Sequence, residues 1–509
     1  MQGFVAIVLA LLCISPPAWA QESGEATTIP VAAQIIDSQG SKWTLRLSDR
    51  AVLKNGVETG VSNILEVWYL NHKVWAWSGT EWKRWLERWQ SAGQEVSWPE
   101  KPPLPTAPGL RTAVPIGPQP GVTCSGVNLK PGDSIQKAVD AHPEDTVFCL
   151  AAGTYAKQSV SPKKGNKFIG AQGAVIDGQG LTSPAFWTTK ASHVVIRNLV
   201  IKNYAVPTQY AMLQLWAPYA LIQQNELTGA TQGAGVWASG HALVIGNYIH
   251  DNAEEGYKVV YDDKNSQRAV GVTFDSNDIH NNNPTHGFWD SGEQGGGKAW
   301  NTQNLTFWYN YSHDNGGPGF WTDYDNIWTI YWYNKSYYNT HGIEHEISYN
   351  ASIIGNDLVQ NGGRDWMKDC PGWYFTCGAV TLENSGGSSG ASAGNIEIAY
   401  NRIIAGKYGR AIPLREQKRG HGQYGEWLVR DVYAHHNTID VTEGLHEAQV
   451  GATNDNGDQE MFAARAGIKF DYNDYVGIGT QHYFSWLNNG WFTWAQWQQQ
   501  GFDLHSTNH

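Results

Sequence analysis

The chain has 509 residues, of which 12% are aromatic, with 25 Trp and 24 Tyr, and only 16% are charged. Its net charge of −12 argues against binding to nucleic acid or to an anionic membrane surface, although a bound cation could still bridge it to an anionic polysaccharide. With 56 Gly and 4 Met, the composition is typical of a turn-rich, aromatic-rich β protein and not of a helical one.

Residues 1–20 have the features of a secretory signal peptide. The apolar core FVAIVLALLCI is too short to span a membrane, and Ala18-Trp19-Ala20 fits the small residues of a cleavage site. No later stretch is long and apolar enough for a membrane helix. We therefore expect a secreted or periplasmic protein that binds neither a membrane nor nucleic acid.

Four cysteines follow the leader: Cys124, Cys149, Cys370 and Cys377. An even count in a secreted chain predicts two disulfides. The local pairings Cys124–Cys149 and Cys370–Cys377 are the simplest of the three possibilities. The alternative, a zinc site, does not fit these spacings.

Residues 28–96 are predicted to form a small β module, because DSQGSKWTLRLSD, AVLKNGVETG and NILEVWYLNHKVWAWSGTEWKRW alternate like short strands around NG and SG turns. The segment resembles small β modules appended to secreted bacterial carbohydrate-active proteins. Its many Trp residues therefore either line a sugar-binding face or form the core of a domain with few aliphatic residues. Residues 97–120 are rich in Pro and predict a stiff, extended linker.

The segment 121–178 is predicted to open a second, larger domain. Asp133-Ser134 can cap a short amphipathic helix, SIQKAVDAH, and the strand DTVFCLAAGTY follows it. A helix at this position would cover the open edge of the first coil of a stacked β structure. Near the other end, FTWAQWQQQGFDLHS predicts a closing helix, and we expect the repeat described next to break after residue 455.

An Asn repeat organises the chain between these ends. Short apolar stretches align on Asn198, Asn225, Asn247, Asn277, Asn310, Asn334, Asn356, Asn401 and Asn437, and the shortest interval is 22 residues. A second Asn follows five residues later in many of the repeats. A period near 22 with apolar–polar alternation indicates a β-solenoid, whose coils have room for three short strands each. The Asn at each turn is expected to tolerate left-handed backbone geometry and to hydrogen-bond its neighbours.

The run CSGVNLKPGDSIQKAVDAHPEDTVFCLAAGTY closely resembles the amino-terminal cap of secreted right-handed β-helix proteins of the pectate-lyase-like superfamily. Together with the Asn repeat, the resemblance covers about residues 122–509. It implies an all-β chain in which residues 121–509 form a right-handed parallel β-helix of three sheets with helical caps. The handedness comes from the resemblance and not from the period. We expect a monomer.

In this superfamily the substrate groove runs along one parallel sheet, so a site is assembled from residues about one period apart. The segments GGGKAWNT, GPGFWTDYDN and GIEHEIS resemble a recurring pattern in secreted β-helix proteins of largely undefined activity, which implies a site without naming a reaction. The candidate catalytic residues are Asp323, Glu346, Lys298, Asp325 and His345. The candidate substrate-binding residues are Trp300, Trp321, Glu293, Arg415 and Glu383. Asp290 and Glu344 are also candidates.

The favoured hypothesis is a polysaccharide-cleaving glycoside hydrolase. Such an enzyme needs two carboxyl groups about 5–5.5 Å apart for retention of configuration, or about 6.5–9.5 Å apart for inversion. Asp323 and Glu346 are one period apart, which places them on adjacent coils, with Trp300 and Trp321 as sugar-stacking platforms. Their offsets from the repeat Asn differ by one residue, however, so strict alternation would point them to opposite faces.

A second hypothesis is a Ca²⁺-dependent lyase acting on a uronate polymer. Lys298 would be the base, and Arg415 would grip a substrate carboxylate. The Ca²⁺ ligands would be Asp290, Glu293, Asp323 and Asp325, which supply the hard oxygen atoms that this ion prefers. The chain lacks the paired aspartates and the full Arg pattern of the standard pectate lyases.

A third hypothesis is a non-catalytic carbohydrate-binding protein, in which the aromatic module and the solenoid grip a glycan. Lys298 would then be a solvated charge or the ion-pair partner of Glu293. Three His residues at equivalent repeat positions, His250, His280 and His313, are expected to stack for structural reasons and not to bind a metal.

Overall fold

The computed structural model describes residues 27–29, 35–46, 51–61, 64, 66–70, 73–77, 82–85, 88–91, 114–260, 268–286, 294–368, 377–389, 394–454, 462, 465–486 and 490–509. The chain divides into two compact units, Met1–Arg111 and Thr112–His509. Within the described residues, no helix has the length and apolar character needed to cross a membrane.

The first unit contains two antiparallel sheets. One consists of β1 (Thr27–Ile29), β6 (Glu66–Leu70), β7 (Lys73–Trp77), β8 (Trp82–Trp85) and β9 (Trp89–Ser91), and the other of β2 (Ile35–Ile36), β3 (Lys42–Arg46), β4 (Ala51–Lys54) and β5 (Val57–Glu58). Trp43 is fully buried, packs edge-on against Trp85 and donates its Nε1–H to Asp37. Trp43 is thus a core residue, whereas the side chains of Trp68, Trp75, Trp77, Trp82 and Trp89 lie outside the described residues.

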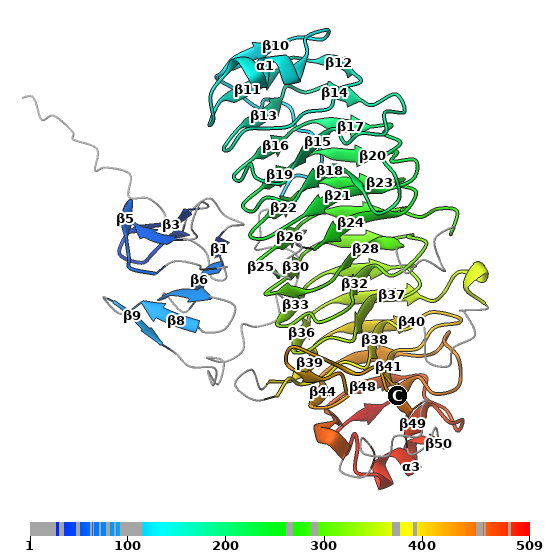
Figure 1. The fold of residues 1–509 in the computed structure, drawn as a ribbon. Helices are drawn as coiled ribbons and strands as arrows, with labels where there is room; N and C mark the ends of the chain where they lie inside the picture. Colours follow the sequence, from blue (N-terminus) through cyan, green and yellow to red (C-terminus); the bar gives the residue numbers. More distant parts are fainter. Residues whose placement is uncertain are drawn as a thin grey trace, which may run out of the picture. The chain divides into compact units, whose positions relative to one another are not determined.

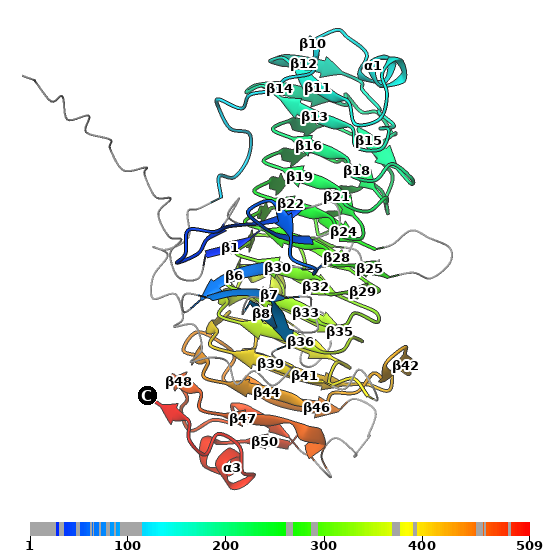
Figure 2. The ribbon, with the colours of Figure 1, turned by 90° about the vertical axis from the view of Figure 1, so that its left-hand side faces the viewer.

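The described part of the second unit coils through three long parallel sheets, stacked from β10 to β49 (Figures 1 and 2). Sheet I consists of β10 (Val127–Leu129), β11 (Val147–Leu150), β13 (Lys167–Gly170), β16 (Val195–Arg197), β19 (Leu221–Gln223), β22 (Leu243–Ile245), β26 (Thr273–Asp275), β30 (Thr306–Trp308), β33 (Thr329–Trp332), β36 (Ala351–Ile354), β39 (Ile396–Ala399), β44 (Val432–His435) and β47 (Lys469–Asp471). Sheet II consists of β12 (Gly153–Ala156), β14 (Ala174–Asp177), β17 (Val200–Lys202), β20 (Glu226–Thr228), β23 (Tyr248–His250), β27 (Asp278–His280), β31 (Tyr311–His313), β34 (Lys335–Tyr337), β37 (Asp357–Asn361), β40 (Arg402–Ala405), β45 (Thr438–Asp440), β48 (Asp474–Val476) and β51 (Thr507–Asn508).

Sheet III carries the candidate site. It consists of β15 (Phe186–Thr188), β18 (Ala211–Leu215), β21 (Ala234–Ala238), β24 (Glu255–Val259), β28 (Gly295–Ala299), β32 (Phe320–Thr322), β35 (Ile343–Glu346), β38 (Val380–Glu383), β41 (Ile412–Glu416), β46 (Val450–Asn454), β49 (Phe484–Trp486) and the antiparallel β50 (Gly490–Phe492). Two short pairs lie beside these sheets, β25 (Ala269–Val270) with β29 (Thr302–Gln303), and the hairpin of β42 (His421–Gly422) and β43 (Gly425–Glu426). The predicted fold class, an all-β right-handed parallel β-helix after a small β module, is confirmed.

The repeat Asn residues form a buried ladder in the turns between sheets I and II. Asn225, for example, donates its Nδ2–H to Asn247 Oδ1 and to the Ile196 carbonyl, while Asn247 Oδ1 also accepts the Asn225 backbone N–H. The expectation that the Asn itself takes left-handed geometry is wrong for most coils. The residue before it does so, as Tyr309 does at φ 53°, because the Asn must point inward to hydrogen-bond. The ladder also continues to Asn473, past the break expected at residue 455.

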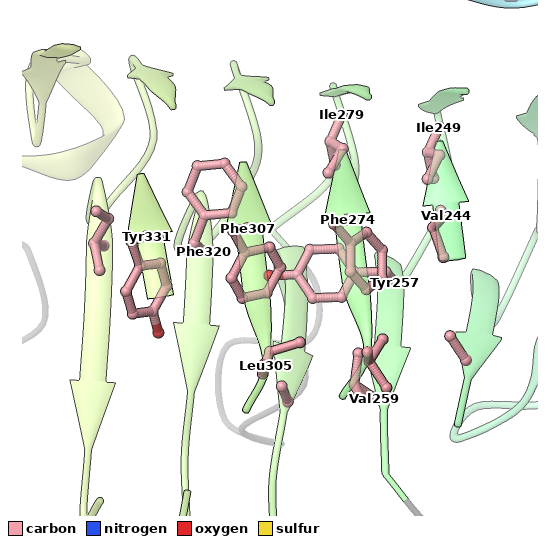
Figure 3. Packing of buried hydrophobic residues seen from close by; sticks show 14 of the residues in the cluster. Val244, Ile249, Tyr257, Val259, Phe274, Ile279, Leu305, Phe307, Phe320 and Tyr331 are labelled. Atoms are coloured by element: carbon pink, nitrogen blue, oxygen red, sulfur yellow. The ribbon is translucent and has the colours of Figure 1, made fainter. Parts of the chain in front are cut away.

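The core of the β-helix lies between the three sheets and is strongly aromatic. Phe274, Phe307 and Tyr331 of sheet I pack in sequence, with ring centroids 5.4 Å apart at each step (Figure 3). Tyr257 and Phe320 of sheet III pack against the same column. Alternate residues of each strand thus fill the interior, and those between them face outward.

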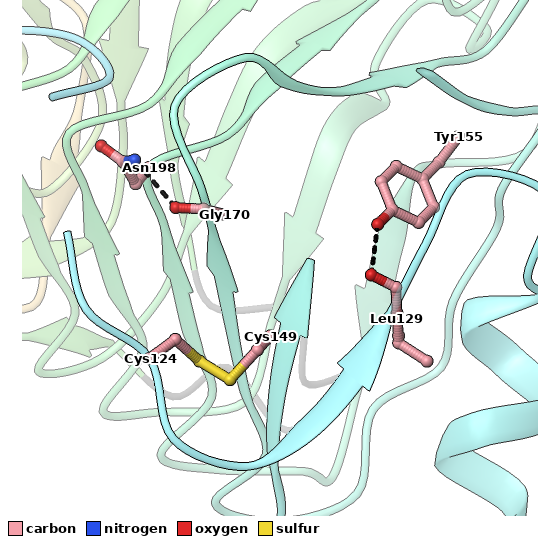
Figure 4. Close-up of a disulfide and its surroundings, with 6 residues drawn as sticks. All are labelled: Cys124, Leu129, Cys149, Tyr155, Gly170 and Asn198. Carbon is pink, nitrogen blue, oxygen red and sulfur yellow. Dashed lines mark hydrogen bonds between the residues drawn. A yellow bond between two sulfur atoms is a disulfide. The ribbon is translucent and has the colours of Figure 1, made fainter. Parts of the chain in front are cut away.

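Both ends of the β-helix are covered. At the first coil, Ser134 caps α1 (Ile135–Ala141), as predicted, and the predicted disulfide Cys124–Cys149 is present (Figure 4). Cys370 lies outside the described residues, so its pairing with Cys377 stays a prediction. At the last coil, the predicted closing helix is α3 (Trp494–Gln499). Elsewhere among the described residues, short 3-10 turns at Asp365–Met367 and Arg465–Gly467 lie in loops.

Candidate active site

The candidate site lies on the outward face of sheet III, where parallel pairing aligns polar residues into two rows. In one row, Lys298 pairs with Trp321 and Trp321 with Glu344. Two residues further along each strand, the second row contains Asp323, Glu346, Glu383 and Arg415, because Glu346 pairs with Glu383 and Glu383 with Arg415. Residues about one period apart are therefore neighbours on one surface.

Asp323, which directly follows β32, is level with Glu346, the last residue of β35. Thr322 pairs with His345, so the next residue of each strand also lies side by side and faces outward. The turn after β32 has two successive left-handed residues, Tyr324 and Asp325, at φ 63° and 62°. These two residues accommodate the one extra residue between Asp323 and its repeat Asn. Asp323 and Glu346 therefore face the same side of sheet III, and not opposite sides as strict alternation would predict.

Asp323 is held by a lysine. Its Oδ2 lies 2.8 Å from Lys298 Nζ, and the Lys298 ammonium also sits over the Trp321 ring, 3.9 Å from its centroid. The Asp323 side chain is 19% exposed, the highest value among the carboxylates of this cluster. The ion pair stabilises the charged carboxylate, and the aromatic ring stabilises the charged ammonium.

Glu346 sits in a different environment. Burial raises its pKa to about 8, and the nearby carboxylates of Asp323, Glu344 and Glu383 add to the rise. Arg419 opposes this rise through a hydrogen bond from Nη1 to Oε1 of 2.6 Å, and Trp321 Nε1 donates to Oε2 at 3.3 Å. Glu346 thus holds its proton more strongly than an ordinary glutamate, as a catalytic acid does.

Two further carboxylates flank this pair, each with a cationic or polar partner. Glu344 Oε2 lies 2.7 Å from His341 Nδ1, and because the Cys377 backbone N–H donates to His341 Nε2, the Nδ1 atom carries the proton. Glu383 lies 3.4 Å from Arg415 Nη1, and burial together with the Glu344 charge raises its pKa. Arg415, predicted to bind substrate, is therefore buried in an ion pair.

Two other predicted residues do not join the cluster. His345 points into the interior, where burial lowers its pKa to about 4, and it hydrogen-bonds Thr322 Oγ1 and the Tyr349 carbonyl. Asp325 is buried in an ion pair with Arg268 and accepts the Gln423 backbone N–H. Trp300 lies level with Asp323, because Ala299 pairs with Thr322, and its ring also lies near that of Trp237, with centroids 6.3 Å apart. Asp290 and Glu293 lie outside the described residues.

The structure adds residues that the sequence did not single out. Arg419 reaches Glu346 from the excursion that contains the β42–β43 hairpin, and it has no repeat position that would have marked it. Lys258 pairs directly with Lys298 across the strands and lies 2.5 Å from Glu255 Oε1, with both side chains fully buried. A signal for Lys258 was available, because EEGYKVV and QGGGKAW place a Lys at the same point of their repeats.

No family model matches the chain, and no curated protein matches it either. Among solved structures, the A-module of Azotobacter vinelandii mannuronan C-5 epimerase AlgE4 is 14% identical, with a TM-score of 0.43, over 70% of this chain and 92% of that one. The catalytic unit of a GH87 α-1,3-glucanase from Streptomyces thermodiastaticus is 13% identical, with a TM-score of 0.39, over 83% and 78%. The PL6 family alginate lyase AlyGC is 12% identical, with a TM-score of 0.37, over 75% and 57%. This likeness concerns the fold alone.

Proposed function

We propose that this chain is a secreted polysaccharide-cleaving glycoside hydrolase, with Glu346 as general acid and Asp323 as its partner carboxylate. The observation that carries the proposal is the level placement of the two residues in opposite environments. Glu346 has a pKa raised to about 8 and holds a proton at neutral pH, whereas Asp323 is ion-paired with Lys298 at 2.8 Å. One group can donate a proton while the other stays charged.

The spacing favours retention of configuration. Adjacent strands lie about 4.8 Å apart, and two level residues on them come closer to the about 5–5.5 Å of retaining enzymes than to the wider inverting spacing. In the first step, an Asp323 oxygen would attack the anomeric carbon while the glycosidic C–O bond breaks and its oxygen takes the Glu346 proton. In the second step, water would replace Asp323 and return a proton to Glu346.

The surroundings of Lys298 give less support to a lyase. A lyase base must lose its proton, but the Asp323 carboxylate and the Trp321 ring both stabilise the Lys298 ammonium. Arg415, which would grip a uronate carboxylate, is paired with Glu383. Asp325, one of the predicted Ca²⁺ ligands, is paired with Arg268. The observed ion pairs therefore favour acid–nucleophile chemistry at the Asp323–Glu346 pair.

The test is digestion of a panel of neutral and acidic polysaccharides, with and without a chelator. Products are followed both as new reducing ends and as ultraviolet absorbance from unsaturated uronates. We expect reducing ends without absorbance, and a loss of about 10²–10⁴-fold in rate for Glu346→Gln and Asp323→Asn. Glu397→Gln, a partly exposed carboxyl on sheet I, is the control and should retain full activity.

Other outcomes would contradict the hydrolase. Absorbance that disappears with the chelator would assign the chemistry to Lys298 and Ca²⁺. A protein that forms no products but is retained on an insoluble glycan would be a binding protein.

A further inference from the structure

A second chemical cluster lies on sheet II, away from the carboxylates of sheet III. His250, His280 and His313 are in register on β23, β27 and β31, and all face outward. Their rings stack as predicted, with centroids 4.8 Å and 4.9 Å apart. The side chains of His280 and His313 are 27% and 19% exposed, so solvent and small ions reach them.

Asp278 places a carboxylate oxygen next to two of these rings, so that three possible metal ligands converge. Its Oδ1 lies 2.7 Å from His280 Nδ1 and 3.2 Å from His313 Nε2. One oxygen and two imidazole nitrogens thus lie within 4.8 Å of one another. A stacked His ladder alone does not require this convergence, because rings can stack while their nitrogens face water.

The orientation of His313 is fixed from its other side. His313 Nδ1 lies 2.9 Å from Asp314 Oδ2, and Arg364 pairs with the other oxygen of Asp314. Both nitrogens of His313 therefore face carboxylate oxygens. A neutral imidazole has only one N–H, so a second proton or a metal cation must lie between Nε2 and Asp278.

Aromatic rings also hold His313 in this orientation. His280 stacks on it, and the Tyr311 ring centroid lies 4.1 Å from its own. The Nε2 atom is thus kept pointing at Asp278, as a ligand to a shared cation would be.

We propose that Asp278, His280 and His313 form a binding site for a divalent transition metal, with Zn²⁺ as the ion that fits best. One carboxylate and two imidazoles are a donor set that Zn²⁺ binds, and water would complete the coordination. Asp314 is the orienting partner of His313, as carboxylates commonly are for metal-bound imidazoles. Because its ligands come from β27 and β31, the bound ion links two successive coils of sheet II.

Zn²⁺ titration of the full chain, after removal of metals with a chelator, tests this site by calorimetry at pH 7.5. We expect one equivalent of Zn²⁺ to bind and to raise the thermal unfolding midpoint. His313→Gln and Asp278→Asn should lose both effects. Asp314→Asn should weaken binding by about 10–100-fold.

His250→Gln is the matched control, because His250 stacks on His280 but does not belong to the converging set. It should bind Zn²⁺ as the wild type does. The metal-free unfolding midpoint of each variant shows whether the variant folds. Binding that persists in His313→Gln, or a wild-type chain that binds no Zn²⁺, would overturn the proposal.

Discussion

At the scale of single residues, the site depends on how the charges around a carboxyl group change its pKa. Glu346 is buried among three other carboxylates, and the charge of Arg419 acts against the resulting rise in its pKa. Arg419 is held near the site by its own loop, in which the Gly422 N–H donates to Tyr349 and the Tyr349 hydroxyl donates to the Gly425 carbonyl. The loop thus sets the pH range in which Glu346 keeps its proton.

Arg419→Gln should move the alkaline limb of activity. A general acid works while protonated, so activity should fall as pH rises through the Glu346 pKa of about 8. Arg419 lowers that pKa, and its removal should shift the limb to higher pH by about one pH unit or more. The measurement is the pH profile of kcat/KM. Arg402→Gln, an exposed cation paired with Asp357, is the control and should leave the limb in place.

An opposite shift, or activity that rises through pH 8, would instead mean that Glu346 works as the ionised base.

The approximate location of this pair could be predicted from the sequence, but its orientation could not. The one-period separation placed Asp323 and Glu346 on neighbouring coils, as the structure shows. Which way they face depends on a turn that absorbs one extra residue at Tyr324 and Asp325, and local alternation contains no information about that turn. Arg419 could not be found at all, because an excursion outside the repeat gives no register.

At the scale of elements, the turns of the β-helix are specified by pairs of residues. The first residue of a pair takes left-handed geometry and turns the chain, and the Asn that follows points inward and satisfies buried backbone groups. Tyr333 and Asn334 show this division, since Tyr333 has φ 54° and Asn334 donates to Asn356 and to the Phe307 carbonyl. The Asn spacing was therefore sufficient to predict the coils. The spacing alone does not show that the hydrogen-bonding role and the left-handed geometry belong to two successive residues.

Asn310→Ala should destabilise the β-helix strongly. Asn310 Oδ1 accepts both the backbone and side-chain N–H of Asn277, and its Nδ2 donates to the Phe274 carbonyl and to Asn334. Each buried group left unsatisfied costs about 1–3 kcal/mol, so we expect a loss of at least about 3 kcal/mol in the free energy of unfolding. Urea unfolding measures it. Asn508→Ala, at an exposed position on β51 where the side chain makes one long hydrogen bond to the Ile478 carbonyl, should cost no more than about 1 kcal/mol. Equal effects at the two positions would show that the ladder contributes nothing beyond a surface Asn.

At the scale of the whole β-helix, stability depends on how the two open ends of the stack are closed. An uncovered last coil exposes unpaired strand edges, which favour association with other chains. The first coil is covered by α1 and tied by Cys124–Cys149. At the last coil the Asn ladder ends at Asp503. Asn473 donates its Nδ2–H to the Asp503 carboxylate, which takes the place of the Asn side chain that accepts this hydrogen bond in the earlier coils. The sequence predicted both closing helices, but not this acceptor, because Asp503 stands outside the repeat.

Asp503→Ala should open the last coil before the rest of the β-helix unfolds. Asp503 accepts hydrogen bonds from Trp497 Nε1 at 2.7 Å, Tyr475 Oη at 2.9 Å and Asn473 Nδ2 at 3.0 Å, and all four side chains are buried. Alanine leaves these donors without an acceptor and frees α3 from the coil beneath it, so limited proteolysis should cut within 490–509 first and the chain should aggregate more readily. Asp503→Asn keeps one acceptor oxygen but replaces the other with an NH₂ group that cannot accept, because both carboxylate oxygens of Asp503 accept hydrogen bonds in the wild type. It should therefore be cut more readily than the wild type and less readily than Asp503→Ala. If both variants behaved like the wild type, the closure would reside in the packing of Trp497 alone, and the carboxylate would not be what ends the ladder.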